Sequence, residues 1–149
     1  MWAMMTTILM MTLSSLLGSE DAVNRPTVDV QMTGSKDKVK FLYDSGAQVS
    51  LMSKKVFRSI SIKHRPSKIK FDLGCSGVSG NKLNIMGCYL FKLNILDKQI
   101  THPFFVADIP GQKGVIGIDI IKKHRLGLDA FTNEPIFQSP TVATLTKEA

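Results

Sequence analysis

Cysteine and histidine are scarce in this sequence, and their scarcity excludes two kinds of small protein. The 149 residues include two cysteines, Cys75 and Cys88, and three scattered histidines. Two cysteines are too few for a disulfide scaffold. The same residues also lack the paired spacing of a closed four-ligand zinc site, so we expect no metal and no other cofactor.

Phosphate-binding motifs and internal repeats are absent as well. Neither GxxxxGK(S/T) nor GxGxxG occurs, so nucleotide binding has no support. No repeat period indicates a solenoid. Apolar residues nevertheless make up 44% of the chain, which is enough for one hydrophobic core, and the length is typical of a single domain.

The first 18 residues differ from the rest of the chain. They carry no charge and include most of the methionines and the only tryptophan. A signal peptide needs a basic start and a membrane helix needs about 20 strongly apolar residues, and this stretch meets neither requirement in full. We therefore interpret residues 1–25 as an apolar extension and linker. Membrane contact by residues 1–18 stays open, and an intracellular location is favoured because the signal-peptide pattern is incomplete.

Short segments of alternating polarity, separated by glycine-rich turns, follow the extension. Val28, Val30 and Met32 share one face of a strand over 27–32, and residues 39–43 form its hairpin partner. The other strand-like segments are 49–52, 68–73, 83–86, 88–96, 100–107, 115–116 and 126–128. Helical spacing occupies 118–125, and Ser53 can cap a brief helix over 54–58.

This pattern predicts an all-β fold, a barrel or sandwich, with one short helix near its C-terminal end. We place the domain at 26–131 and expect a flexible tail over 132–149, where Pro135 and Pro140 interrupt regular structure.

Asp44 is the first candidate for chemistry. It ends an apolar strand and is followed by three small residues, Ser45, Gly46 and Ala47. A carboxylate at a strand end projects from a rigid support, and the glycine permits a sharp bend and a close approach by another group. Taken alone, the tripeptide fits an ordinary turn between two strands better than it fits a site.

Further motifs change that balance, because their order resembles the retropepsins, the aspartic proteases of retroviruses and LTR retrotransposons. The active-site motif, an apolar strand followed by Asp-Thr/Ser-Gly-Ala, is matched by residues 41–47, and Ser50 matches a Ser or Thr found downstream in many retrotransposon members. The family's hydrophobic-hydrophobic-Gly element before a helix is matched by Val115, Ile116 and Gly117. Its glycine-rich flap is matched by Gly77, Val78, Ser79 and Gly80.

The resemblance, which spans about Thr27 to Asp129, implies a closed acid-protease barrel with a flap hairpin and aspartic endopeptidase activity without a cofactor. It implies that Asp44 is catalytic, that Ser45 braces the two active-site loops, and that Gly46 and Ala47 line the cleft. The substrate would be an extended polypeptide beneath the flap, such as a retroelement polyprotein.

The chain has a single Asp-Ser/Thr-Gly motif, and this predicts a homodimer. Hydrolysis by paired carboxylates needs two acids that share one proton. Asp44 is the only aspartate followed by Ser/Thr-Gly, so the second carboxylate must be the Asp44 of another chain, across a two-fold axis. Asp119, by contrast, we interpret as a first-turn charge that favours its helix dipole.

Two other functions stay open. One is a catalytically inactive retropepsin-like module that dimerises or binds peptides. The other is a nucleic-acid-binding β-domain, suggested by a segment, 54–70, that has seven Lys or Arg and no acid. Few aromatic residues accompany these charges, so nucleic-acid contact is not favoured.

We interpret the cysteines as small buried apolar residues, and His102 and His124 as structural or surface residues.

Overall fold

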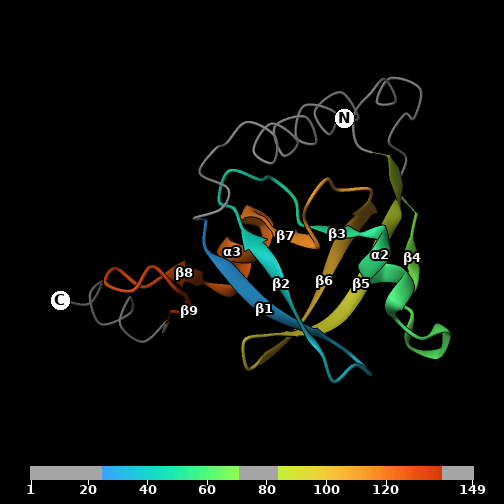
Figure 1. Cartoon of the computed structure of the whole chain (residues 1–149), viewed down its shortest axis with the longest axis horizontal. Helices are drawn as coiled ribbons and strands as arrows, with labels where there is room; N and C mark the ends of the chain where they lie inside the picture. The colour runs from blue at the N-terminus through green and yellow to red at the C-terminus, as the bar shows by residue number, and fades with distance from the viewer. Residues whose placement is uncertain (1–24, 71–83, 139–149) are drawn as a thin grey trace.

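The structure is a computed structural model that describes residues 25–70 and 84–138. Its strands are β1 (Thr27–Met32), β2 (Lys38–Tyr43), β3 (Leu51–Ser53), β4 (Lys68–Ile69), β5 (Ile85–Ile95), β6 (Lys98–Ala107), β7 (Gly114–Ile116), β8 (Leu126–Leu128) and β9 (Pro135–Phe137). Its helices are α2 (Lys54–Ser59), a 3₁₀ turn η2 (Ile62–His64) and α3 (Ile118–His124). Figure 1 shows the strands curved around one another, with the β8–β9 hairpin projecting to one side.

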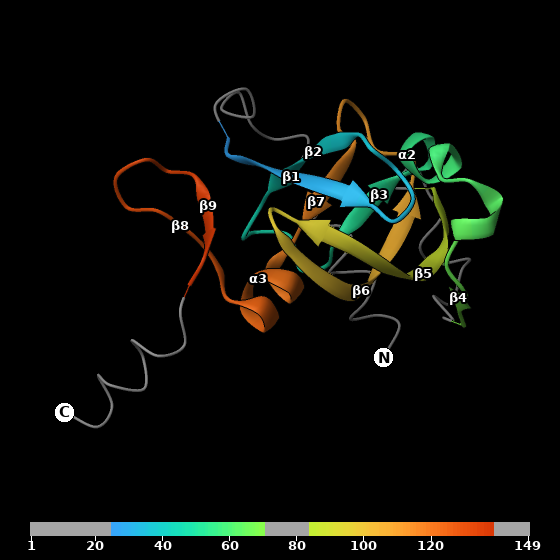
Figure 2. The ribbon, with the colours of Figure 1, turned by 90° about the horizontal axis from the view of Figure 1, so that it is seen from below.

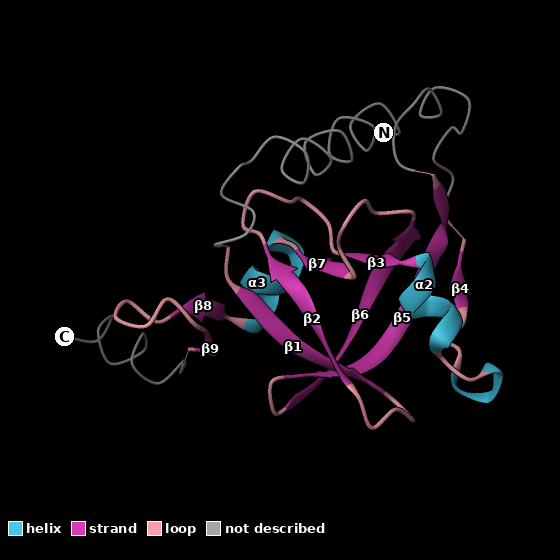
Figure 3. Ribbon diagram, in the orientation of Figure 1, coloured by secondary structure: helices cyan, strands magenta, loops and turns pink. Residues whose placement is uncertain are grey.

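Six strands form a closed barrel. Their order is β1-β2-β7-β3-β6-β5, and β1 pairs with β5 to complete the ring, while β4 adds to the outer side of β5. Most neighbours are antiparallel, but β2 pairs with β7 and β3 pairs with β6 in parallel. The predicted barrel is therefore confirmed, and Figure 3 shows α2 and α3 at different sides of it.

The alternation of apolar residues explains the barrel wall. Val28, Val30 and Met32 on β1 are at most 5% exposed, as the period of two predicts. The long β5–β6 hairpin turns at Leu96 and Asp97, where Leu96 takes the left-handed conformation with φ 55°. The core is built mainly from aliphatic and aromatic side chains, among them Phe41, Leu51, Met52, Phe91, Leu93, Phe104 and Ile116.

The brief helix expected after Ser53 is confirmed as α2, and the Ser53 hydroxyl caps it by accepting the Val56 N–H. Two other expectations about the elements need correction. The two strand segments around Gly87 form one strand, β5, because a bulge between Ile85 and Gly87 keeps the pairing with β6 continuous. Residues 135–137, assigned above to the tail, form β9.

The β8–β9 hairpin extends the regular structure beyond residue 131, the predicted end of the domain. Leu126 pairs with Phe137, and Leu128 pairs with Pro135. Asp129 closes the intervening turn, because its carboxylate accepts the N–H groups of Phe131 and Thr132. Figure 2 shows the hairpin extending away from the barrel next to α3. The expected flap at 77–80 lies outside the described residues, as does the extension at 1–24.

The close approach of β7 to Phe41 generates a stability prediction. A Cβ on Gly114 would lie 2.4–2.5 Å from the ring of Phe41, which is fully buried and cannot move aside. We expect Gly114→Ala to lower the free energy of unfolding by about 1–3 kcal/mol in urea titrations. In the matched control, Gly127→Ala, the nearest atoms belong to the exposed Gln138 side chain, so the change should stay within about 0.5 kcal/mol. Equal effects of the two substitutions would contradict this account.

Candidate functional site

The loop after β2 carries Asp44 and lies against the start of α3. The Asp44 N–H donates to the Ile116 carbonyl at 3.0 Å, which extends the parallel pairing of β2 with β7 by one residue. The Ile118 N–H donates to the Ala47 carbonyl at 2.8 Å. These two bonds hold the two motifs identified in the sequence, 44–47 and 115–117, side by side.

Gly117 makes this contact possible. Its N–H donates to the Ser50 hydroxyl at 2.9 Å. A Cβ at this position would lie 2.7 Å from the Val49 carbonyl oxygen and 2.8 Å from that of Ala47. Because these neighbours are backbone atoms held in the loop, only glycine lets the loop approach so closely.

The Asp44 carboxylate is largely buried, and each of its oxygens has a partner. Its residue is 8% exposed, whereas Ser45 and Gly46 beside it are exposed and Ala47 is buried. The Gly46 N–H donates to Oδ1 of Asp44 at 2.9 Å. The Arg25 guanidinium donates from Nη1 to Oδ2 of Asp44 at 3.4 Å. One oxygen thus meets the backbone of its own loop, and the other meets a positive charge.

A second carboxylate, Asp119, braces this loop from α3. Its Oδ1 accepts the Ser50 hydroxyl at 2.7 Å, and its Oδ2 accepts the Ser50 N–H at 3.1 Å. His102 Nε2 on β6 lies 2.9 Å from the same Oδ2. Asp119 therefore does more than the helix-dipole role expected of it. It ties α3 and β6 to the loop that carries Asp44.

The surroundings of Asp119 also shift two pKa values. Burial raises the pKa of Asp119, but hydrogen bonds from His102 and Ser50 outweigh this, so the pKa lies below its usual 3.8. On β5, burial and the negative charge of Asp119 raise the pKa of the Cys88 thiol to about 11. Cys88 is 5% exposed, which confirms its interpretation as a small buried residue, whereas Cys75 lies outside the described residues.

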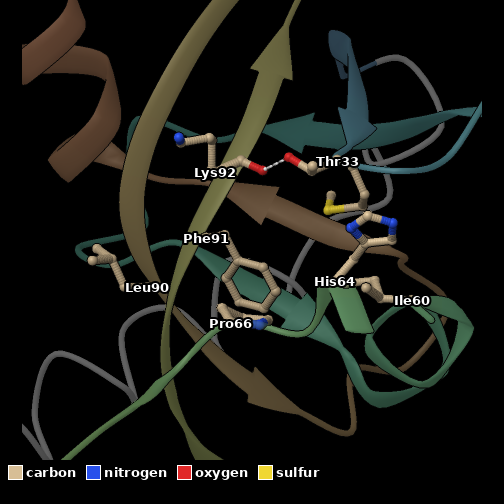
Figure 4. A pocket seen from close by; sticks show the side chains of 8 residues that line it. Thr33, Ile60, His64, Pro66, Leu90, Phe91 and Lys92 are labelled. Carbon is tan, nitrogen blue, oxygen red and sulfur yellow. Dashed lines mark hydrogen bonds between the residues drawn. The ribbon is translucent and has the colours of Figure 1, made fainter. Parts of the chain in front are cut away.

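The described part of the chain also has hollows outside the Asp44 loop. A pocket of about 160 Å³ lies between η2, β1 and β5, with Ile60, Pro66 and Phe91 among its lining residues. Figure 4 shows this pocket and the bond from the Thr33 hydroxyl to the Lys92 carbonyl at its edge. A larger hollow of about 440 Å³ is lined by Arg25 and by residues of the turn before β9, and it borders the site.

Two further findings concern only the described residues. No group of three or more His, Cys, Asp or Glu side chains in the described ranges is placed to hold a metal ion. Within the same ranges, no helix has the length and apolar character needed to cross a membrane. The flap residues 77–80 lie outside these ranges, so their place relative to Asp44 stays a prediction.

Sequence reasoning missed Arg25 and underrated His102. Arg25 was assigned to a linker, because a single charge before Pro26 carries no periodic or motif signal. His102 was recognised only as structural or surface, because its partner Asp119 is distant in sequence and the two meet only when β6 packs beside α3. Ser50, by contrast, is part of the family resemblance, and it lies at the centre of the contacts between the loop and Gly117.

The comparisons with known proteins agree with this geometry. No protein-family model matches the sequence. The retroviral protease-like domain of Ddi1 from Leishmania major superposes with a TM-score of 0.63 at 22% identity, over 77% of this chain and 89% of that one. The EIAV protease complexed with the inhibitor HBY-793 superposes with a TM-score of 0.50 at 20% identity, over 70% of this chain and 92% of that one. The chain therefore has a retropepsin-like fold, as its motifs predict.

The lowered pKa of Asp119 generates a prediction about acid stability. As the pH falls, the unfolded chain takes up a proton at this group before the folded chain does, so stability present above pH 3.8 is lost as the pH falls through the lowered value. We expect Asp119→Asn to lower the free energy of unfolding by about 1–3 kcal/mol at pH 7, because the hydrogen bonds to Ser50 are weakened. The free energy of unfolding of this variant should also fall less steeply at acidic pH.

Urea titrations of both proteins between pH 2 and 7 measure this effect. The difference in unfolding free energy between wild type and Asp119→Asn should shrink as the pH falls below 3.8. A difference that is constant over the whole range would contradict the assignment of this pH dependence to Asp119.

Proposed function

We propose that this chain is an aspartic-type endopeptidase that acts as a homodimer, with one Asp44 from each chain at the catalytic centre. The observation that carries the proposal is the Asp44 carboxylate at the end of β2, in a loop bonded to Ile116 and Ile118. Its Oδ1 accepts the Gly46 N–H of the same loop. The retropepsin-like fold supports the proposal, since one neighbour of this fold is a protease complexed with an inhibitor.

The chemistry follows from two carboxyl groups that share one proton. The ionised carboxylate takes a proton from a water molecule, which attacks the peptide carbonyl carbon, while the protonated partner donates its proton to the carbonyl oxygen. The tetrahedral intermediate then collapses as the C–N bond breaks. The carboxyl group that took the water proton gives it to the nitrogen, and the other carboxylate takes a hydroxyl proton from the intermediate, so the pair again shares one proton. The products are a free carboxyl group and a free amine, and the reaction uses no metal or cofactor.

The neighbouring residues receive supporting roles in this proposal. Ser45, exposed at the loop tip, braces its counterpart loop across the two-fold axis, and Gly46 and Ala47 line the cleft. Val115, Ile116 and Gly117 hold the loop from behind. An extended polypeptide, such as a retroelement polyprotein, binds as a strand, and the residues Gly77, Val78, Ser79 and Gly80 cover it as a flap.

The second candidate is a catalytically inactive module of the same fold that dimerises or binds peptides. One observation favours it: the Arg25 guanidinium lies 3.4 Å from Oδ2 of Asp44, the oxygen that catalysis would need. Such a module would self-associate and bind peptides without cleaving them, so turnover separates the two functions.

Substitution of Asp44 tests the proposal most simply. Asp44→Asn keeps the size of the side chain and removes its ability to act as a base, so cleavage of a peptide library should fall by at least about a thousandfold. The matched control is Asp37→Asn, because Asp37 is exposed in the β1–β2 turn and should leave the rate unchanged. Circular dichroism should show that both variants fold. Cleavage by Asp44→Asn near the wild-type rate would refute the assignment.

The pH profile provides an independent test. One carboxyl group must be ionised and the other protonated, so kcat/KM should follow a bell with its maximum at acidic pH. A statine-type mimic of the tetrahedral intermediate should inhibit the reaction. A rate that rises through neutral pH, together with inhibition by a chelator or a thiol reagent, would contradict a carboxylate mechanism.

A further inference from the structure

Arg25 lies directly before β1 and reaches the proposed catalytic group of its own chain. Its Nη1 is 3.4 Å from Oδ2 of Asp44, and the two side chains are 25% and 9% exposed, respectively. The backbone next to Arg25 is fixed to the same strand end, because the Tyr43 N–H donates to the Pro26 carbonyl at 2.9 Å. Arg25 is therefore held beside Asp44 by neighbouring backbone as well as by charge.

The carboxylate needs a compensating group because little water reaches it. An ionised carboxylate in such a place is costly unless charge or hydrogen bonds offset its lost hydration. In the single chain, the Gly46 N–H serves Oδ1 and the Arg25 guanidinium serves Oδ2. In a pair of chains, the proton shared with the second Asp44 would compensate the same charge. Guanidinium and shared proton are thus alternative partners for one carboxylate.

The two partners differ in what they allow. A guanidinium stays protonated at any working pH, so it can neither take a proton from a water molecule nor transfer one to a carbonyl oxygen. While the guanidinium contacts Oδ2, Asp44 can act neither as the base that takes the water proton nor as the acid that protonates the carbonyl oxygen. A second Asp44 must take the place of Arg25 before a proton can be shared.

We propose that Arg25 is a lock on the single chain: its ion pair with Asp44 stabilises the unpaired state and must break when two chains bring their Asp44 side chains together. This inference rests on the proposed homodimer and adds a control point to it. Loss of the Arg25 charge therefore favours self-association. Arg25 contacts Asp44 only in the unpaired chain and takes no part in the reaction, so it is a positioning residue.

Sedimentation equilibrium of the full-length chain tests the lock without any activity measurement. Arg25→Gln should tighten self-association by roughly three- to tenfold relative to the matched control Arg58→Gln. Arg58 is exposed in the last turn of α2, and its substitution removes the same charge. Arg25→Lys, which keeps the charge but loses the guanidinium, should lie between wild type and Arg25→Gln.

Ionic strength gives a readout that a purely structural role of Arg25 would not move. Salt screens the ion pair, so wild type and Arg58→Gln should associate more tightly as salt rises, and Arg25→Gln should respond less. If Arg25→Gln weakens association, or matches Arg58→Gln at every salt concentration, the lock is refuted. If Arg25→Gln does not fold, the comparison of Arg25→Lys with wild type over the same salt series decides, with a smaller salt response again expected for the weaker pair.

The same samples separate this inference from the proposed function. Peptide cleavage is assayed at concentrations where the chains are paired. Dimers that do not cleave peptides would refute the proposed endopeptidase activity. The sedimentation data would still show whether Arg25 weakens self-association. If the dimers cleave peptides but Arg25→Gln does not change their association, the lock is refuted and the proposed endopeptidase activity is not.

Discussion

A carboxylate removed from water must find a partner, and this constraint governs the site around Asp44. Its side chain is 9% exposed, and both oxygens are engaged, one by the Gly46 N–H and one by Arg25. A single chain satisfies the constraint with a guanidinium. A symmetric pair would satisfy it with a shared proton, which is also the arrangement that hydrolysis requires. The same burial can therefore serve a resting state and a reacting state.

The barrel supplies the rigidity that this arrangement needs. Parallel pairing of β2 with β7 brings Asp44 to Ile116, and the absence of a side chain on Gly117 lets the loop pack onto the start of α3. Asp119 then joins Ser50 on the loop to His102 on β6. Loop, helix and barrel wall thus share one polar network at the edge of the apolar core, so Asp44 is held by a fixed frame rather than by a free turn.

Alternation and glycine turns lie in neighbouring residues, so local pattern predicts most of the strands. The motif at 44–47 taken alone fits an ordinary turn. Only the family resemblance points to it together with Ser50 and the element 115–117, which the fold brings side by side. The partners of Asp119 and the position of Arg25 depend on packing between distant segments, for which a single sequence carries no periodic signal. β9 escaped notice because two prolines favoured a tail, while its pairing with β8 depends on the turn at Asp129.

The central claim is that activity requires an Asp44 from each of two chains. Mixing wild type with the Asp44→Asn variant at a constant total concentration, followed by subunit exchange, tests this most directly. With equal amounts, activity per total chain should fall to about one quarter of wild type, because only pairs of two intact chains can cleave. A fall to about one half would mean that each chain works alone, and it would contradict the account.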